Sequence, residues 1–335
     1  DYDKSNVNRL LEALQHRETD RVPHLELWVS SRAVYEYVLE HELEDDVTIP
    51  SHGGLRATPE AQVEFALRLG LDAVACDFSW QPCNGHPGEL EPAPSLASQI
   101  SHLERYLRAA QGTGVGVIAR FSSFFGPAMV AAGIRDAQQE FQANRTMLLQ
   151  LMDKLLTRQE RVMRVVCDRI ARDLALIMVS EDVATASGLA LESKLFESVF
   201  MHRLERLVAA AKDHDKLLLM HSKGSVAQFM PILHELGFDA VHPIEPEHND
   251  IFELRKEWAG KLALVGNIPT SLLAESSSTE IETRVREHCV RLASGGGYVL
   301  SSSGGITPKI PPENFVTMAT AVRKYGRYGD LGSEI

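Results

Sequence analysis

Residues 217–245, LLLMHSKGSVAQFMPILHELGFDAVHPIE, contain the unit whose repetition predicts the fold. The unit opens with an apolar run that ends at His221, continues through a glycine turn into helical sequence, and closes with the run FDAVHPIE. A β-type run, a helix and a second β-type run are typical of a βαβ unit with parallel strands. The unit therefore predicts that His221 and Glu245 end two neighbouring strands.

The same alternation extends from this unit to both ends of the chain. Eight β-type runs, each followed by helical sequence, lie at 21–28, 71–78, 115–121, 174–182, 217–221, 238–245, 261–266 and 296–303. This pattern predicts the α/β class and a (β/α)8 TIM barrel, preceded by a helical N-terminal extension over 5–15 that Ser5 caps. Active sites of such barrels lie at the C-terminal ends of the strands. The residues at those ends are Glu26, Asp77, Arg120, Asp182, His221, Glu245, Asn267 and Ser302.

Length, charge and cysteine content limit the class of protein. The 335 residues show no linker and no repeat of 20–50 residues, so we expect a single domain over 1–335. The net charge of −12 argues against nucleic acid and anionic membranes as partners. The four cysteines lack CxxC spacing, and neither a signal peptide nor a long apolar span is visible. We therefore expect a cytoplasmic protein.

His221 and Glu245 are candidate metal ligands because an imidazole and a carboxylate at adjacent strand ends make half of a zinc site. His242, three residues before Glu245, is a candidate for supporting contacts behind the ligands. Two other interpretations remain open. His221 can instead bond neighbouring loop backbone, and Glu245 can instead pair with an arginine or cap a loop.

Three further carboxylates are candidate catalytic groups. Glu26 lies within an apolar run, where a carboxylate is costly unless it is paired or ligated, and Asp77 has the same character. The alternative for Asp77 is an ion pair with Arg120. Because side chains alternate along a strand, Asp182 and Glu181 point to opposite sides, and we favour Asp182 for the pocket.

Two loops are candidates for the wall and mouth of the pocket. The loop 79–98 is rich in proline and carries Trp80, which suggests a lid or a substrate wall. In the loop after the last strand, Gly304 and Gly305 allow backbone N–H groups to approach a ligand closely, although glycine also serves simple tight turns.

Four stretches carry a family resemblance. They are NRLLEALQHRETDRVP (8–23), HSKGSVAQFMPILHELGFDAVHPIEP (221–246), KLALVGNIPTSLL (261–273) and GGGYVLSSSGGITPKIPPENFVTMATAVRKYG (295–326). Together they resemble the uroporphyrinogen decarboxylase superfamily, which includes the decarboxylase itself and corrinoid-linked methyltransferases. The resemblance implies a (β/α)8 barrel and suggests a homodimer.

The chain departs from the pattern of the true decarboxylase. After the first strand that enzyme has an arginine-rich stretch for its acidic tetrapyrrole, whereas here WVSSRAVYEY offers only Arg32. Its last strand is followed by a GHGI motif, whereas here Ser303-Gly304-Gly305-Ile306 lacks the histidine. Asp77 does match the position of its essential aspartate. Uroporphyrinogen is therefore a poor fit as substrate.

The methyltransferase branch implies a zinc site whose first ligand matches His221, and Glu245 stands at the spacing of a glutamate in the related cobalamin-independent methionine synthases. Lys223 stands where one cysteine ligand is expected, and Ser302 or Ser303 where another is expected, so methyl transfer to a thiol is a poor fit. A nitrogen and oxygen site, completed by Asp182 or Glu26, suits a Lewis acid acting on an ether oxygen. That chemistry resembles the first methyltransferase of bacterial O-demethylase systems. There a small, often methoxylated aromatic donor gives its methyl group to the cobamide of a separate corrinoid protein.

The resulting hypothesis is a corrinoid-linked, zinc-assisted methyltransferase. Its expected substrate-binding residues are Trp28, Phe78, Trp80, Arg120, Phe124 and Ser302. One alternative is a metal-free decarboxylase in which Asp77 steers protonation while Arg120 or Lys223 binds a carboxylate. Another is a carrier that binds a corrinoid or tetrapyrrole without turning it over.

Overall fold

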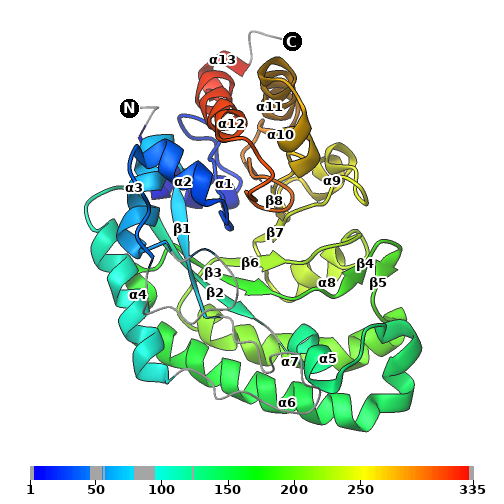
Figure 1. The fold of residues 1–335 in the computed structure, drawn as a ribbon. Helices are drawn as coiled ribbons and strands as arrows, with labels where there is room; N and C mark the ends of the chain where they lie inside the picture. The colour runs from blue at the N-terminus through cyan, green and yellow to red at the C-terminus, as the bar shows by residue number, and fades with distance from the viewer. Residues whose placement is uncertain (1–3, 46–54, 56, 79–94, 123, 332–335) are drawn as a thin grey trace. The chain divides into compact units, whose positions relative to one another are not determined.

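The computed structural model describes residues 4–45, 55, 57–78, 95–122 and 124–331 (Figure 1). The chain divides into two compact units, each built from segments that are distant in sequence. Unit 1 comprises Asp1–Ala75, Arg105–Val117 and Pro243–Ile335, and unit 2 comprises Cys76–Glu104 and Ile118–His242. The expectation of a single domain over 1–335 stays a prediction.

Unit 2 is built on parallel strands whose C-terminal ends align. The strands are β2 (Gly116–Ser122), β3 (Leu176–Ser180), β6 (Leu218–His221) and β7 (Ala240–His242). In the register, Ser122 pairs with Ser180, Ser180 with His221, and His221 with His242. The interior of these strands is buried and apolar, as expected for a parallel sheet covered by helices. The polar side chains therefore gather in one row at the strand ends.

Long helices cover these strands. Helices α6 and α7 pack against each other on one side of β2, β3 and β6 (Figure 1). Asp136 caps α6 by accepting the Gln139 N–H, and Gly133 ends α5 in the left-handed conformation. The helices and the small hairpin outside the main sheet are α4 (Leu96–Ala110), α5 (Phe125–Ala132), α6 (Ala137–Ile170), the 3-10 turn (Ala171–Asp173), β4 (Ala184–Thr185), β5 (Gly188–Leu189), α7 (Ser193–Lys212) and α8 (Met230–Glu235).

Unit 1 continues the strand pattern, with one predicted strand present only as bridges. Strand β8 (Ala263–Val265) pairs in parallel with β9 (Tyr298–Val299). The run 21–28 follows β9 through bridges, including His24 to Leu300, and the Asp72 N–H beside β1 (Ala73–Asp77) donates to the His24 carbonyl. Pro23 has no N–H to donate, which shortens the ladder at this point. The α/β class and the strand–helix alternation of a TIM barrel are as predicted.

Side chains cap several helices of unit 1, and the cap of the first helix differs from the prediction. Thr58 caps α3 with Pro59 in the first turn. Helix α1 is capped by Asn6 and not by Ser5, because the Asn6 side chain accepts the Asn8 N–H while Ser5 Oγ donates to the Ala66 carbonyl. The helices are α1 (Val7–Leu14), α2 (Arg32–Leu39), α3 (Pro59–Leu69), α9 (Ile251–Trp258), α10 (Thr270–Glu275), α11 (Ser278–Leu292), α12 (Pro312–Tyr325) and α13 (Tyr328–Leu331).

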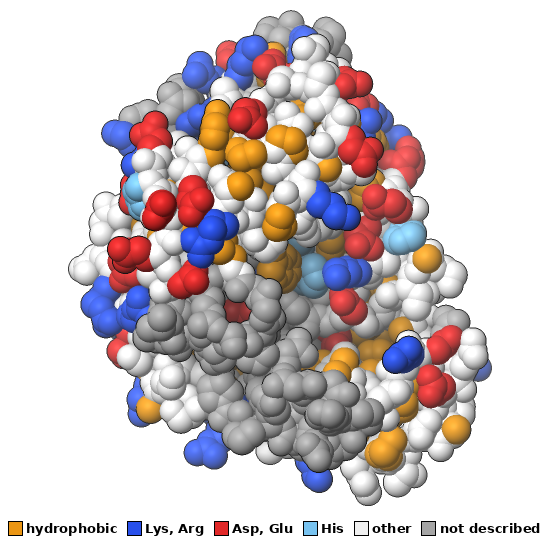
Figure 2. Space-filling view, viewed as in Figure 1, with side chains coloured by type: hydrophobic (Ala, Val, Ile, Leu, Met, Phe, Trp, Pro, Cys, Tyr) orange, Lys and Arg blue, Asp and Glu red, His pale blue; other side chains and the backbone are white. Residues whose placement is uncertain are grey.

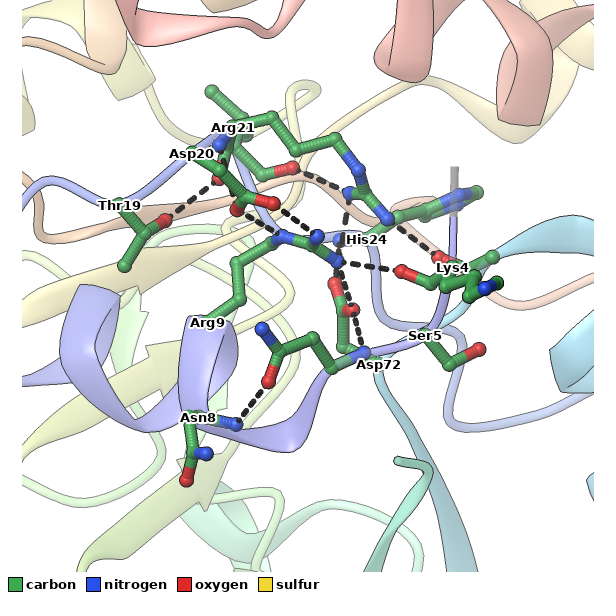
Figure 3. A network of polar contacts seen from close by, with 12 residues as sticks. Lys4, Ser5, Asn8, Arg9, Thr19, Asp20, Arg21, His24 and Asp72 are labelled. Atoms are coloured by element: carbon green, nitrogen blue, oxygen red, sulfur yellow. Dashed lines mark hydrogen bonds and ion pairs between the residues drawn. The ribbon is translucent and has the colours of Figure 1, made fainter. Parts of the chain in front are cut away.

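A buried ionic network ties α1 to the strand region of unit 1 (Figure 3). Arg9 bonds Asp20 through two nitrogens, at 2.5 and 2.6 Å, and bonds Asp72 at 2.6 Å. Arg21 lies 3.6 Å from Asp72, whose side chain is fully buried. Buried charges are tolerated only when they are paired and hydrogen-bonded in this way. The network therefore anchors the N-terminal extension.

The surface mixes charges of both signs. Figure 2 shows acidic and basic side chains interspersed over the face in view, with apolar side chains in small groups between them. Within the described part of the chain, no helix is long and apolar enough to cross a bilayer.

Candidate functional site

Two histidines lie side by side at the aligned strand ends of unit 2. His221 ends β6 and His242 ends β7, and their Nδ1 atoms are 2.8 Å apart. Such a contact needs one shared proton, so one ring donates and the other accepts. The pairing leaves the Nε2 atom as the outward-facing nitrogen of His221, and sequence reasoning had anticipated His242 only as a supporting residue.

Both imidazoles are held in the neutral form. Burial, together with the positive charges of Lys223 and Arg120, lowers the pKa of His221 to about 3. Burial likewise holds the pKa of His242 well below its usual value, with contributions from His221 and Arg120. A neutral ring beside two cations suits contact with a group that is or becomes negative.

Asp182 lies at the rim of this pair. Its Oδ1 is 3.9 Å from His221 Nε2 and accepts the Lys223 backbone N–H at 3.0 Å. About half of the Asp182 side chain is exposed. The carboxylate is thus within reach of a ligand bound near His221.

Glu181, the next residue back, points to a different part of unit 2. Its carboxylate is buried and accepts three backbone N–H groups at the start of α5, from Phe124, Phe125 and Gly126, at 2.8–2.9 Å. The structure thus separates the two acidic side chains as strand alternation predicts. The capping role of Glu181 has no signal in the local sequence, since the helix lies more than 50 residues away.

Asp77 forms an ion pair with Arg120, the alternative considered for it. The pair crosses from the end of β1 to β2, and 43% of the Asp77 side chain remains exposed. Phe78 is buried and stacks on Phe121, with ring centroids 5.0 Å apart. Phe124 is buried against Phe200, with centroids 5.8 Å apart. A pocket-wall role for these rings stays a prediction, and Trp80 lies outside the described residues.

In unit 1, Glu26 is fully engaged by the last loop. Its carboxylate accepts the Ser302 N–H at 2.8 Å and the Ser302 hydroxyl at 2.7 Å, and it lies 3.3 Å from His24 Nε2. Ser302 Oγ in turn accepts the Gly305 N–H at 3.1 Å. The buried carboxylate is therefore satisfied by hydrogen bonds, which explains how an acid is kept within an apolar run.

The two glycines of this loop are held by close contacts. A Cβ on Gly305, which has a φ of +82°, would lie 2.8 Å from the carbonyl oxygen of half-buried Trp28. A Cβ on Gly304 would lie 3.3 Å from Thr270 Cγ2. A histidine at position 304 therefore requires Thr270 to move.

Glu245 follows a strained residue. Ile244 has a φ of +56° although it is β-branched, a conformation that costs on the order of 1–3 kcal/mol. Its carbonyl accepts the Asn267 side-chain N–H at 2.6 Å. The Glu245 carbonyl accepts the N–H groups of His248 and Asn249, and the residue is half-buried.

The predicted zinc ligands do not form a complete donor set. His221 belongs to unit 2 and Glu245 to unit 1, and one ring nitrogen of His221 is engaged by His242. Among the described residues, no group of three or more His, Cys, Asp or Glu side chains is placed to hold a metal ion. Zinc at this site stays a prediction, and no catalytic step below depends on it.

Comparison with a family model decides the family. The model for uroporphyrinogen decarboxylase (URO-D) matches residues 92–325, well over half of the chain. The chain belongs to the URO-D family. Uroporphyrinogen decarboxylases of Legionella pneumophila, strains Lens and Philadelphia 1, are each 28% identical over 131 residues. These alignments cover 39% of this chain and 36% of each relative, so the chain matches about a third of their length.

Solved structures support the fold of this URO-D-family enzyme. A methyltransferase from Methanosarcina mazei matches with a TM-score of 0.70 at 17% identity, over 96% of this chain and 99% of that chain. Endo-glycoceramidase II from Rhodococcus sp. matches with a TM-score of 0.51 at 12% identity, over 89% and 79%. The predicted family and barrel fold are confirmed.

Proposed function

We propose that this URO-D-family enzyme transfers a methyl group from a small donor, such as a methoxylated aromatic compound, to the cobalt of a corrinoid. The corrinoid is either carried by a partner protein or bound as a cosubstrate. The observation that carries the proposal is the neutral His221–His242 pair beside two cations at the aligned strand ends. A fold shared over nearly the full length with a protein named as a methyltransferase supports methyl transfer as the class of reaction.

Methyl transfer from an ether breaks the bond between methyl carbon and oxygen as the bond between carbon and cobalt(I) forms, and it leaves an oxyanion. Lys223 and Arg120 supply the positive field that stabilises this developing charge. His221 keeps its neutral ring over the pH range of catalysis, so its Nε2 serves as a hydrogen-bonding partner and not as an acid. Its role is to hold the donor oxygen beside the two cations.

Two features weigh against decarboxylation of a large polyanionic substrate. Arg32, the only base in the stretch after the first strand, is already paired with Glu36 and Asp45 and donates to the Leu43 carbonyl. Gly304 lies against Thr270 where the decarboxylase motif has histidine. Release of carbon dioxide from a smaller acid, with Asp77 and Arg120 as the site, remains the alternative because that ion pair is partly exposed.

The test is methyl transfer to cob(I)alamin with a panel of methoxylated aromatic donors. We expect methylcobalamin and demethylated donor in equal amounts. His221→Ala should lower the rate about 100-fold, whereas His202→Ala, at an exposed position on α7, should leave it unchanged. Carbon dioxide release from acids without cobamide, combined with no methylcobalamin from any donor, would replace this proposal by the decarboxylase.

Zinc is a separate part of the proposal, because His221 Nε2 would then hold the metal in place of the donor oxygen. We expect about one zinc per chain in the wild-type protein and its loss in His221→Ala. The same amount of zinc in both proteins, or none in either, removes His221 from the metal site without touching the methyl-transfer proposal.

A further inference from the structure

The backbone at Ile244 needs outside support. Ile244 is fully buried and has a φ of +56°, in the left-handed region that β-branched residues avoid. Such a conformation persists only where the surroundings over-determine it. The residue that follows is Glu245, so the shape of the chain at Ile244 sets the direction in which the Glu245 side chain leaves the backbone.

Asn267 provides that support from the end of β8. Its side-chain amide donates to the Ile244 carbonyl at 2.6 Å, and the residue is 2% exposed. The segments around Gly266 and Pro243 lie close together, since a Cβ on Gly266 would lie 2.1 Å from the Pro243 carbonyl oxygen. Glycine at 266 thus permits the contact that lets Asn267 reach Ile244.

His288 on α11 orients the Asn267 amide. Its Nε2 lies 3.0 Å from Asn267 Oδ1, which directs the amide nitrogen toward Ile244. The ring is 2% exposed and has an edge contact with Phe252 at 5.3 Å between centroids, and its Nδ1 lies 2.9 Å from the Arg284 carbonyl oxygen. A neutral imidazole has one N–H, and the proposed orientation of Asn267 requires that it lies on Nε2. Three buried residues thus form one chain of contacts: His288, Asn267 and Ile244.

We propose that Asn267 and His288 are positioning residues that hold Ile244 in its left-handed form and thereby aim the Glu245 carboxylate. The inference about the backbone stands on the contacts alone. Its catalytic consequence rests on the proposed function and on the role in the site that the sequence predicts for Glu245.

The first readout is independent of activity. The N–H groups of His248 and Asn249 donate to the Glu245 carbonyl at 3.1 and 3.0 Å, so their hydrogen exchange reports on this segment. Asn267→Ala and the volume-conserving His288→Phe, which keeps the contact with Phe252 but has no N–H, should each speed exchange at both amides by about tenfold or more. The matched control is Asn314→Ala, whose amide donates to the Leu273 and Ser276 carbonyls elsewhere in unit 1.

The second readout is kinetic and uses the whole enzyme. Asn267→Ala should lower kcat about 10- to 100-fold with little change in KM, because a misdirected group loses catalysis more than binding. The double variant Asn267→Ala with Glu245→Gln should have the same kcat as Glu245→Gln alone, since both changes remove the same contribution.

The possible outcomes distinguish the positioning role of Asn267 and His288 from the proposed function. Unchanged exchange in both Asn267→Ala and His288→Phe overturns the positioning role, and so does a rate loss that adds fully to that of Glu245→Gln. If the variants exchange faster at the two amides but the wild-type enzyme makes no methylcobalamin, the positioning role is supported and the proposed function is contradicted.

Discussion

Replacing Glu181 by glutamine should destabilise the protein through the start of α5. The helix has no side-chain cap from its own N-cap residue, Phe124, so the Glu181 carboxylate satisfies the N–H groups of Phe124, Phe125 and Gly126 from β3. Glutamine keeps one acceptor oxygen and turns an NH2 group toward at least one of these donors. The site is 2% exposed, so water cannot replace the lost acceptor.

The expected loss follows from the contacts. A hydrogen bond to a charged acceptor contributes about 1.5–3 kcal/mol, and a buried N–H left unpaired costs about 1–3 kcal/mol. The attraction between the carboxylate and the positive N-terminus of the helix contributes about 2 kcal/mol more at most, as much as in other partly buried sites. The neutral glutamine amide costs less to desolvate than the carboxylate, which offsets part of the loss. We expect a decrease of about 2–4 kcal/mol in the free energy of unfolding.

Equilibrium unfolding in urea, followed by circular dichroism, measures this loss. The matched control is Glu140→Gln, since Glu140 also accepts two backbone N–H groups at a helix start, from Arg135 and Asp136 at 3.2 Å, in a less buried setting. The control should lose less than about 1 kcal/mol. A Glu181→Gln protein as stable as the control would refute the reasoning.

Two further predictions concern acid and backbone conformation. Burial lowers the folded-state pKa of His221 to about 3, so below pH about 6.5 the native state binds fewer protons than the unfolded chain. The free energy of unfolding is therefore highest above that pH and falls as the pH drops. Between pH 7 and 5 the wild type should lose about 2 kcal/mol more than His221→Gln in urea unfolding, and equal losses would contradict the assignment. Gly305→Ala should destabilise by about 2 kcal/mol or more, because its Cβ meets the Trp28 carbonyl at a φ of +82°. Gly260→Ala, with a φ of +74° and open space around the Cβ, should lose about 1 kcal/mol in the same urea unfolding assay, and equal losses would show that the contact is unimportant.

Some strand ends could be predicted because the strand leaves a local signal. The apolar run before His221 stops at that residue, where β6 ends, and β1 ends at Asp77, one residue before the end of the predicted run. The prediction that Glu245 ends a strand is wrong, because β7 ends at His242. Asp182 and Glu181 point in different directions as predicted, although both follow Ser180, the last residue of β3. Local patterns of this kind were enough for the fold class.

The partners of these residues could not be predicted because they come from distant parts of the chain. Glu26 is satisfied by Ser302, 276 positions away, and Asn267 reaches Ile244 across 23 positions. Neither pairing leaves a periodic signal. The cap of α1 was misassigned for a related reason, since Ser5 and Asn6 are both good caps and only the distant Ala66 carbonyl draws the Ser5 hydroxyl away.

The most direct test of the central claim is a single-turnover reaction of the wild-type protein with stoichiometric cob(I)alamin and an excess of methoxylated aromatic donors. The account predicts methylcobalamin formed in step with the free phenol, at a rate that falls about 100-fold in His221→Ala. No methylcobalamin from any donor, together with carbon dioxide release from a carboxylic acid that Asp77→Asn abolishes, would contradict it.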